Sequence, residues 1–485
     1  MQAQLPPPPR ADLDTSWLPP MLHGAGYSHA ELLKIGSIAD PGGLAAAEAK
    51  LKGGLGTPVF RTLARLFYLG NAVPTSFVDE ALPGRGAAAL VEAGLARTRG
   101  PDVVASASLT SLEGVYTASD PFASDGHPLT PGLESVLPVG NATQITSQLL
   151  SREPAQLALD LGCGQGYLSA VVAGYASRVI ATDVSDRALG FTRFNARMNG
   201  RTNVEVRRGS LLEPVADLRG QFDLIACNAP FVLSATGSIA SISGSGQGDD
   251  LVECLMRETP GMLRQGGRLV LACSWHHDEK DWSARPREWL SGKGIDAWLV
   301  RFSSTTSDHY ANQIRSIEGD EAAQRWKDFA ARHDIRFIAF GALVAQRREG
   351  DTWLRAEALN PIARREGPSP VTRIFANQRF IYAHRDPQQL RPIKLRVAPG
   401  VAGVQGKAPK TGAPVVQLQH ASGFAMPTDV TPGVAQIIAL FDGTRTTEEV
   451  LALVQTPKPE DLERGRQELL QVATMLLARG FVEIA

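Results

Sequence analysis

The sequence predicts an α/β protein with a largely parallel sheet at its centre and small helical modules at both ends. From Leu157 onward, short apolar runs alternate with amphipathic segments, which is the pattern of a parallel sheet covered by helices on both faces. The flanking regions instead show helical spacing of apolar residues, interrupted by turns and short strand-like runs. These two observations set the fold class.

Each strand of the central sheet is expected where an apolar run is bounded by turn residues. We expect seven strands, the last two assigned from their β-rich composition, with a helix over residues 320–333 between them. The expected strands are residues 157–161, 178–183, 204–208, 222–228, 268–274, 295–302 and 335–345.

Composition divides the chain into five segments. Residues at the N-terminus are Pro-rich, three helices and a hairpin then follow the winged-helix plan, and a Pro- and Gly-rich stretch separates the sheet from the last helices. The expected segments are a flexible lead-in (1–25), a winged-helix-like domain (26–125), the sheet domain (126–387), a linker (388–414) and a small helical, winged-helix-like module (415–485).

The charge balance and the cysteines exclude several classes of protein. Lys and Arg total 49 against 50 Asp and Glu, a formal net charge of -1, whereas proteins that grip long nucleic acid usually carry a basic excess. The arginines over residues 187–208 could still form a local basic face, or simply a solvated helix face. No cysteine pair has zinc-ribbon or thioredoxin spacing, and no apolar run suits a signal peptide or membrane helix. We therefore expect a soluble, cytoplasmic protein without membrane contact.

The strongest local motif is Asp-Leu-Gly-Cys-Gly-Gln-Gly, residues 160–166, at the end of the first expected strand. Alternating glycines let the backbone approach a ligand closely. A dinucleotide site favours GxGxxG without a preceding acid, whereas here Asp160 lies two residues before the first glycine. Its carboxylate suits a cationic or amino-bearing ligand better than a pyrophosphate. The alternative is a tight turn that binds nothing.

A second acidic residue, Asp183, ends the second expected strand 17 residues after Gly166. Nucleoside-binding α/β folds place the carboxylate that accepts the ribose hydroxyls at this point. The alternative is that Asp183 caps the helix that begins near Ser185.

The fourth expected strand ends in Asn228-Ala229-Pro230-Phe231. The Asn228 side-chain oxygen and the Ala229 carbonyl can both accept hydrogen bonds from one planar NH2 group, on which Phe231 can stack. A planar amide is a poor nucleophile because its lone pair is delocalised; two acceptors favour tetrahedral geometry and stabilise developing positive charge. The alternative is a plain Asn-Pro turn.

Together, residues 160–166, Asp183 and residues 228–231 resemble the class I S-adenosylmethionine-dependent methyltransferases. They are most similar to the subgroup with an Asn-Pro-Pro-Tyr/Phe motif, which includes release-factor glutamine methyltransferases and N6-adenine or N2-guanine methyltransferases of nucleic acids. The resemblance covers roughly residues 130–350. It implies a Rossmann-like sheet of seven strands with the last antiparallel, S-adenosylmethionine as cofactor, S-adenosylhomocysteine as product, and no metal. A looser resemblance is to bacterial members with an N-terminal winged-helix-like extension.

The resemblance also assigns site residues, with two departures from the family pattern. Ala229 replaces the family's first proline, which leaves the corner less rigid, and Ser210 stands where many members have an Asp that contacts the adenine amine. The implied catalytic residues are Asn228, Ala229, Pro230 and Phe231; the implied cofactor-binding residues are Thr143, Asp160, Gly162, Cys163, Gly164, Gly166, Asp183, Val184, Ser210, Leu211 and Asn228.

The sequence leaves two alternatives for the role of each of two further segments. His276 and His277 are adjacent and point to opposite sides of an extended chain, so we expect no metal site there; with Trp275 and Trp282 they could line the acceptor pocket or a surface loop. The Gly/Ser-rich residues 234–248 could close over the acceptor, or form a disordered excursion.

Three functions remain open from the sequence. The first is an N-methyltransferase that acts on a planar nitrogen of a macromolecule, either a protein glutamine or a base in RNA or DNA. The second uses the same chemistry on a small-molecule acceptor, with the C-terminal module as a contact for a homodimer or a carrier. The third is a non-catalytic scaffold that binds the cofactor, which the intact Asp160, Asp183 and Asn228 argue against.

Overall fold

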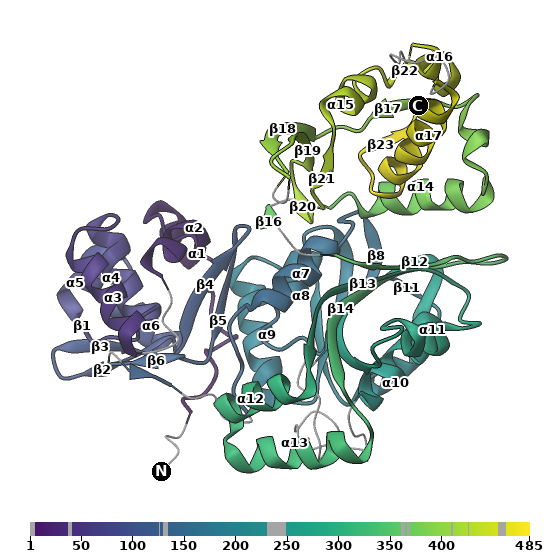
Figure 1. Ribbon diagram of the computed structural model, residues 1–485. Helices are drawn as coiled ribbons and strands as arrows, with labels where there is room; N and C mark the ends of the chain where they lie inside the picture. The colour runs from purple at the N-terminus through teal and green to yellow at the C-terminus, as the bar shows by residue number, and fades with distance from the viewer. Residues whose placement is uncertain are drawn as a thin grey trace. The chain divides into compact units, whose positions relative to one another are not determined.

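The computed structural model describes residues 5–36, 41–125, 127–129, 134–229, 249–359, 364–365, 369–408, 411–424, 426–453 and 462–485 (Figure 1). The chain separates into two compact units. The first comprises Met1–Ser147, Glu153–Ile295 and Ser304–Glu349, and the second Gln148–Arg152, Asp296–Ser303 and Gly350–Ala485.

The central sheet is mixed, with the strand order β10-β9-β8-β11-β12-β14-β13-β15 (Figure 1). Strands β10, β9, β8, β11 and β12 are parallel neighbours, and β14 is antiparallel to β12. The strands are β8 (Ala155–Leu161), β9 (Ala176–Asp183), β10 (Val204–Arg208), β11 (Phe222–Asn228), β12 (Leu263–His277), β13 (Ile295–Thr306), β14 (Phe337–Arg347) and β15 (Leu354–Ala358). The predicted α/β class is confirmed; each of the seven expected segments overlaps a strand of this sheet, and β14, the seventh of them, is antiparallel to β12.

Over the described residues, the sheet nevertheless has eight strands rather than the seven predicted. The additional strand, β15, pairs in parallel with β13. Two of its five residues, Arg355 and Glu357, are charged, and four of the five are only half-buried. It therefore lacks the apolar run by which the other strands were recognised.

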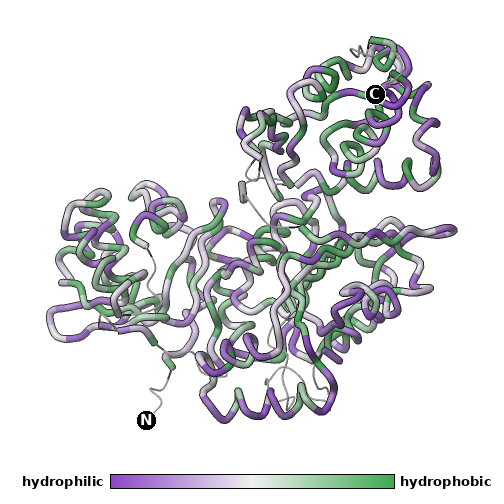
Figure 2. The backbone as a smooth tube through the Cα atoms, viewed as in Figure 1, coloured by the Kyte–Doolittle hydropathy of each residue, from purple (hydrophilic) through white to green (hydrophobic). Residues whose placement is uncertain are grey.

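Helices cover the strands that carry the site. They are α7 (Asn141–Leu149), α8 (Tyr167–Val172), α9 (Asp186–Met198) and α10 (Asp250–Glu258). Helix α9 packs against β9 and β10, and α8 packs against β8 and β9. Apolar residues concentrate along the central strands, whereas α13 (Asp320–Arg332) mixes polar and apolar residues (Figure 2). This is the pattern expected when a sheet is buried on both faces and outer helices meet water.

The N-terminal residues contain the expected three helices and hairpin, preceded by further helices. In order, the elements are α1 (Leu18–Gly24), α2 (His29–Ile35), α3 (Pro41–Lys52), α4 (Pro58–Phe67), β1 (Val73–Pro74), α5 (Thr75–Ala81), α6 (Gly86–Glu92), β2 (Ala96–Arg99) and β3 (Asp102–Ala105). The sheet order is β1-β3-β2. The lead-in expected to be flexible carries α1, whose Leu18 and Leu22 are fully buried.

A second hairpin, β4 (Ser108–Leu112) and β5 (Val115–Ser119), follows and was not expected from the sequence. It packs on α9 through two asparagines. The Ala118 backbone exchanges two 2.8 Å hydrogen bonds with the Asn195 amide, and the Tyr116 N–H donates to Asn199 Oδ1 at 3.0 Å. One hydrophobic core includes Leu18, residues of α4, and Phe194 of α9.

The second unit contains the C-terminal elements. They include α14 (Val371–Ala383), β17 (Lys394–Val397), β18 (Val401–Lys407), β19 (Pro414–His420), β21 (Thr428–Val430), α15 (Pro432–Ile438), β22 (Asp442–Thr446), α16 (Thr447–Ala452), α17 (Leu462–Ala478) and β23 (Val482–Ile484). The expected linker, 388–414, contains β17 and β18, which pair in two three-stranded sheets, and Leu395 is fully buried. Helix α16 begins with a capping box formed by Thr446 and Glu449. Among the described helices, none is both long and apolar enough to span a bilayer.

Candidate active site

The three motifs meet at one edge of the sheet because β8, β9 and β11 are parallel neighbours. Asp160 on β8 is in register with Ala226 on β11 and with Ala181 on β9, so the carboxyl ends of all three strands lie together. The chain order reverses here, since β9 lies on one side of β8 and β11 on the other. In open α/β sheets, ligands bind in the crevice at such a reversal.

The glycine loop after β8, residues 162–166, is hydrogen-bonded to β9 and has free space beside its first two glycines. The N–H groups of Gly162 and Cys163 both donate to the Thr182 carbonyl at 2.9 Å. Gly162 and Gly164 have φ of 72° and 54°, and a Cβ on either would meet no described atom within 4 Å. The loop therefore leaves space for a ligand against its backbone.

At the third position, Gly166, glycine is needed for packing rather than for ligand access. Gly166 has φ of 82°, and a Cβ there would lie 2.8 Å from Thr192 Oγ1 and 2.9 Å from Thr192 Cα on α9. The Thr192 hydroxyl in turn donates to the Gly164 carbonyl at 3.0 Å and contacts Cys163 Sγ at 3.2 Å. Close packing of α9 against the loop thus requires glycine at this position.

These differences predict unequal effects of alanine in the loop. Gly166→Ala is expected to lower the free energy of unfolding by about 2–5 kcal/mol, the sum of left-handed strain and overpacking. Gly162→Ala carries the strain alone, about 1–2 kcal/mol, but narrows the open side of the loop and is expected to weaken ligand binding. Urea unfolding of both variants measures the difference, and equal losses of stability would contradict the packing argument.

Asp160 is buried with one oxygen unsatisfied. Its side chain is 1% exposed. Ser169 Oγ on α8 donates to Oδ2 at 2.5 Å, whereas Oδ1 has no hydrogen-bond partner among the described residues. Burial raises the pKa of this carboxyl to about 6, against the lowering effect of Ser169. A buried carboxylate oxygen without a donor is costly and fits a ligand that brings an N–H group or a positive charge.

Asp183 is held at the end of β9 by two backbone donors. Gly164 N–H donates to Oδ2 at 3.0 Å and Ser185 N–H to Oδ1 at 2.9 Å. Burial raises the pKa of this half-buried carboxyl. The cap of α9 is Ser185, whose hydroxyl accepts from Ala188 N–H at 3.2 Å, so the capping alternative for Asp183 is wrong.

Three other residues assigned from the resemblance lie on the loops after β9 and β10. Val184 follows Asp183 directly. Ser210 and Leu211 lie in the turn after β10, which is held against β9 because Gly209 N–H donates to the Asp183 carbonyl at 3.1 Å. Leu211 adopts a left-handed conformation with φ of 50°. The structure therefore brings this turn beside the Asp183 backbone.

Asn228, at the end of β11, is oriented by a residue 85 positions earlier. Its Nδ2 donates to Thr143 Oγ1 on α7 at 2.9 Å. Its Oδ1 is buried and has no hydrogen-bond partner among the described residues. Ala229 is buried, and its N–H donates to the Ala272 carbonyl at 3.1 Å. The hydrogen bond to Thr143 thus orients the Asn228 amide, and Oδ1 can accept a hydrogen bond from a substrate.

Some of the sequence predictions fall on residues outside the described part of the chain. These are Pro230, Phe231 and the Gly/Ser-rich segment 234–248.

At the end of β12, the side chains of Trp275 and His276 contact other residues of the protein. Trp275 is fully buried, and its Nε1 donates to the Trp282 carbonyl at 2.9 Å. His276 lies 3.3 Å from Asp249, a carboxylate 1% exposed that also accepts from Arg285 at 2.8 Å. Burial lowers the pKa of His276. Within the described ranges, no group of three or more His, Cys, Asp or Glu side chains is placed to hold a metal.

The arginines considered as a basic face are largely engaged in ion pairs and hydrogen bonds. Arg187 pairs with buried Asp120, and its guanidinium donates to the Pro6 carbonyl at 2.6 Å. Arg197 bonds the Ala11 carbonyl. Two more pair with neighbouring acids, Arg207 with Glu205 and Asp217, and Arg208 with Asp186. These contacts reduce the positive charge that this face could offer to phosphates.

Residues that the sequence did not single out complete the site. Asn195, fully buried on α9, donates to the Gln165 carbonyl at 2.7 Å as well as to β5. Ser169, Thr192 and Asp249 were also missed. Their roles depend on partners distant in sequence, and no local motif marks them; a buried polar position on a helix face is the one available signal.

Comparison with known proteins adds family evidence for two segments. A family described as Methyltransferase small domain matches residues 130–282, and one described as Domain of unknown function (DUF7059) matches residues 42–106. A release factor glutamine methyltransferase of Aliivibrio fischeri is 39% identical over 80 residues, covering 16% of this chain and 28% of that protein.

Two other relatives also carry names of protein methyltransferases. A ribosomal protein uL3 glutamine methyltransferase of Bordetella pertussis is 32% identical over 142 residues, covering 26% of this chain and 47% of that protein. A ribosomal protein L11 methyltransferase of Caldanaerobacter subterraneus is 33% identical over 103 residues, covering 21% and 32%. The chain spans less than half the length of each of these three relatives. Residues 130–282 thus match a family model of methyltransferases, and the strand arrangement there is the Rossmann-like one of class I S-adenosylmethionine-dependent methyltransferases.

Proposed function

We propose that this protein transfers a methyl group from S-adenosylmethionine to a planar amide nitrogen of a protein, a glutamine side chain foremost. The observation that carries the proposal is the Asn228 amide, whose nitrogen donates to Thr143 and whose buried oxygen is unpaired among the described residues. That oxygen lies at the same sheet edge as Asp160 and Asp183. Two of the relatives are named for methylation of glutamine.

The residues present fit the cofactor. The unpaired oxygen of Asp160 suits its amino group, the open side of Gly162 and Gly164 admits a ligand, and Asp183 ends the strand where ribose hydroxyls are accepted. When bound, S-adenosylmethionine supplies an electrophilic methyl group. Further residues proposed to border it are Thr143, Cys163, Gly166, Val184, Ser210 and Leu211.

The chain's own contribution to the reaction is to orient the acceptor amide. Asn228 Oδ1 and the Ala229 carbonyl accept the two N–H bonds of the substrate NH2, which aims the nitrogen lone pair at the methyl group. Both oxygens also stabilise the positive charge that develops on nitrogen. The extra proton leaves the nitrogen to solvent once the N–C bond has formed. No metal is part of this proposal.

A protein acceptor is favoured over a nucleic acid by charge and by the relatives. The formal net charge is -1, and three of the six arginines of residues 187–208 form internal ion pairs. All three relatives are named for protein substrates.

The test is transfer of labelled methyl groups from S-adenosylmethionine into cell extract separated into protein, RNA, DNA and small metabolites. We expect label in the protein fraction alone. Label in RNA, DNA or metabolites would overturn the choice of acceptor. Absence of cofactor binding in calorimetry would overturn the proposal as a whole.

Thr143 is expected to act by positioning Asn228. Thr143→Val removes the hydroxyl that accepts the Asn228 N–H, and loss of one such bond predicts about a tenfold fall in kcat. Thr143→Ser should restore the rate, because it retains the hydroxyl. Thr143 is also proposed to border the cofactor, and the affinity for S-adenosylmethionine, measured by calorimetry, separates the two roles: a loss of affinity equal to the loss of kcat would contradict positioning of Asn228 as the main role.

A further inference from the structure

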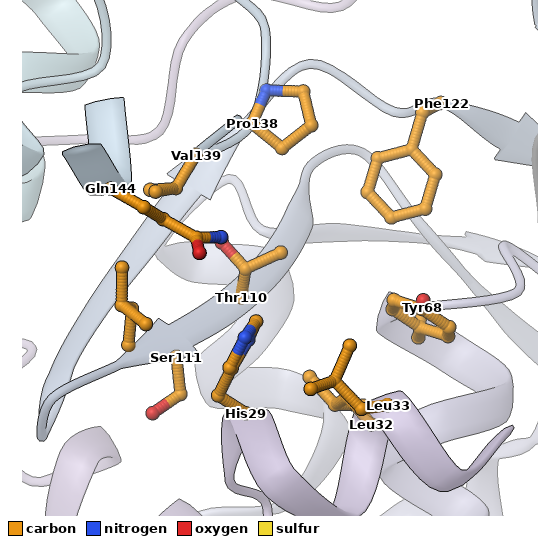
Figure 3. Close-up of a pocket in the computed structure, with 11 residues that line it drawn as sticks. His29, Leu32, Leu33, Tyr68, Thr110, Ser111, Phe122, Pro138, Val139 and Gln144 are labelled. Carbon is orange, nitrogen blue, oxygen red and sulfur yellow. The ribbon is translucent and has the colours of Figure 1, made fainter. Parts of the chain in front are cut away.

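A cavity of about 220 Å³ lies in the first unit, between the N-terminal helices and the segment that leads into α7 (Figure 3). Figure 3 shows Tyr68 and Phe122 along one side, Leu33 on a helix below, and Pro138 and Val139 above. Gln144 on α7 also lines it. None of the residues proposed to bind cofactor is among those lining the cavity.

The cavity opens onto apolar surface. Leu33, which lines it, is 65% exposed, and Leu137, next to the lining residue Pro138, is 57% exposed. A mostly apolar cavity with exposed apolar side chains at its rim offers another molecule an apolar surface to bury. Pockets for whole small ligands commonly measure about 300–1,000 Å³, so this cavity better suits one side chain than a metabolite.

The cavity is linked to the acceptor site through a short piece of chain. Val139 and Gln144 line the cavity, and Thr143, which accepts the Asn228 N–H, lies between them. Val139 is four residues from Thr143, so their Cα atoms are at most about 14 Å apart. An extended substrate chain spans the same distance in about four residues.

We propose that this cavity receives a large apolar side chain of the substrate polypeptide, within four residues of the methylated amide. The inference rests on the proposed function and adds a sequence preference of the enzyme for residues that flank the methylated amide in the substrate. It also assigns the N-terminal region a role in substrate binding. Tyr68 belongs to the segment matched by the family of unknown function, whereas Pro138, Val139 and Gln144 belong to the segment matched by the methyltransferase family.

The experiment uses synthetic nonapeptides with a central glutamine in a Gly/Ser background. One residue, either Leu or Asp, is moved through the eight flanking positions, and labelled methyl transfer is measured with the full-length protein. We expect one flanking position at which Leu raises kcat/KM at least tenfold over Asp, as burial of one leucine allows. If extract proteins but not peptides are labelled, the tryptic peptide carrying the label should show an apolar residue within four positions.

Leu33→Glu tests the cavity itself, with Phe77→Glu as a matched control. Both side chains are exposed, 65% and 54%, but Phe77 does not line the cavity. Leu33→Glu should remove the preference for Leu, or lower labelling of the extract protein at least tenfold, whereas Phe77→Glu should keep wild-type behaviour. Calorimetry with S-adenosylmethionine should give wild-type affinity for both.

The outcomes separate this inference from the proposed function. Transfer without any preference for flanking residues, or with a preference that Leu33→Glu leaves intact, overturns the cavity proposal alone. Cofactor binding without transfer to any peptide or extract protein overturns the proposed function, and the cavity proposal with it.

Discussion

Asn228→Ala is expected to reduce methyl transfer at least 10²–10³-fold, the range found when one donor or acceptor for developing charge is removed. The variant deletes the buried oxygen that we propose accepts the substrate N–H, and also the NH2 that donates to Thr143. The substrate nitrogen would then lose both its orientation and part of its charge stabilisation. Initial rates with labelled S-adenosylmethionine measure the effect.

Cofactor affinity and a second asparagine provide the controls. Calorimetry should show that Asn228→Ala binds S-adenosylmethionine within about threefold of wild type. Although the resemblance also places Asn228 beside the cofactor, Asp160, the glycine loop and Asp183, to which we assign the main cofactor contacts, are untouched. Asn312→Ala, on the exposed face of α12 (Ser307–Glu318), should retain full activity. An Asn228→Ala protein that transfers methyl groups at the wild-type rate would rule out the proposed acceptor site.

Asp160→Asn is expected to weaken S-adenosylmethionine binding between about tenfold and a hundredfold at pH 7.5. The substitution preserves shape but removes the charge, and charge-assisted hydrogen bonds contribute about 1.5–3 kcal/mol. The free energy of unfolding of Asp160→Asn should instead equal or exceed that of the wild type. Burial of the ionised carboxyl raises its pKa from 3.8 to about 6, a cost of up to roughly 3 kcal/mol that the neutral amide avoids. The variant should bind less well yet unfold no more easily.

The same carboxyl predicts a pH dependence of binding. A cationic or amino-bearing ligand favours ionised Asp160, so affinity should be full above pH 6 and fall about tenfold per pH unit below it. Stability of the free protein has the opposite sign: because the folded pKa is raised, this group makes folding more favourable as pH falls from about 6 toward 3.8. Calorimetry at pH 5–7.5 measures the first trend. Wild-type affinity that stays constant over this range would contradict the assignment, as would an equally steep trend in Asp160→Asn.

The parts of the site that the sequence predicts are those encoded at strand ends. Asp160, Asp183 and Asn228 each lie at the last or next-to-last residue of a parallel strand, so recognition of three strands is enough to bring them to one edge. The partners of these residues are different. Ser169 meets Asp160 through the packing of α8, and Thr143 meets Asn228 from 85 residues away. Such contacts depend on tertiary packing and leave no local pattern.

Composition was misleading where proline and glycine are frequent. Residues 388–414 contain β17 and β18 despite their loose composition, since pairing to β22, β23 and β19 supplies the hydrogen bonds. The lead-in contains α1, for which Leu18 and Leu22 at i and i+4 were a usable helical signal. Short, polar β15 had no such signal, because its pairing with β13 decides its conformation.

The most direct test of the central claim is the chemical identity of the methylated atom. Protein labelled by the enzyme from methyl-labelled S-adenosylmethionine is hydrolysed in acid. If the acceptor is a side-chain amide, acid hydrolysis of the N-methylamide releases the label as methylammonium, which becomes volatile methylamine when base is added, and this is the predicted result. Label that stays on a free amino acid, as in methylated lysine, or that is released by mild base as methanol from an ester, would contradict it.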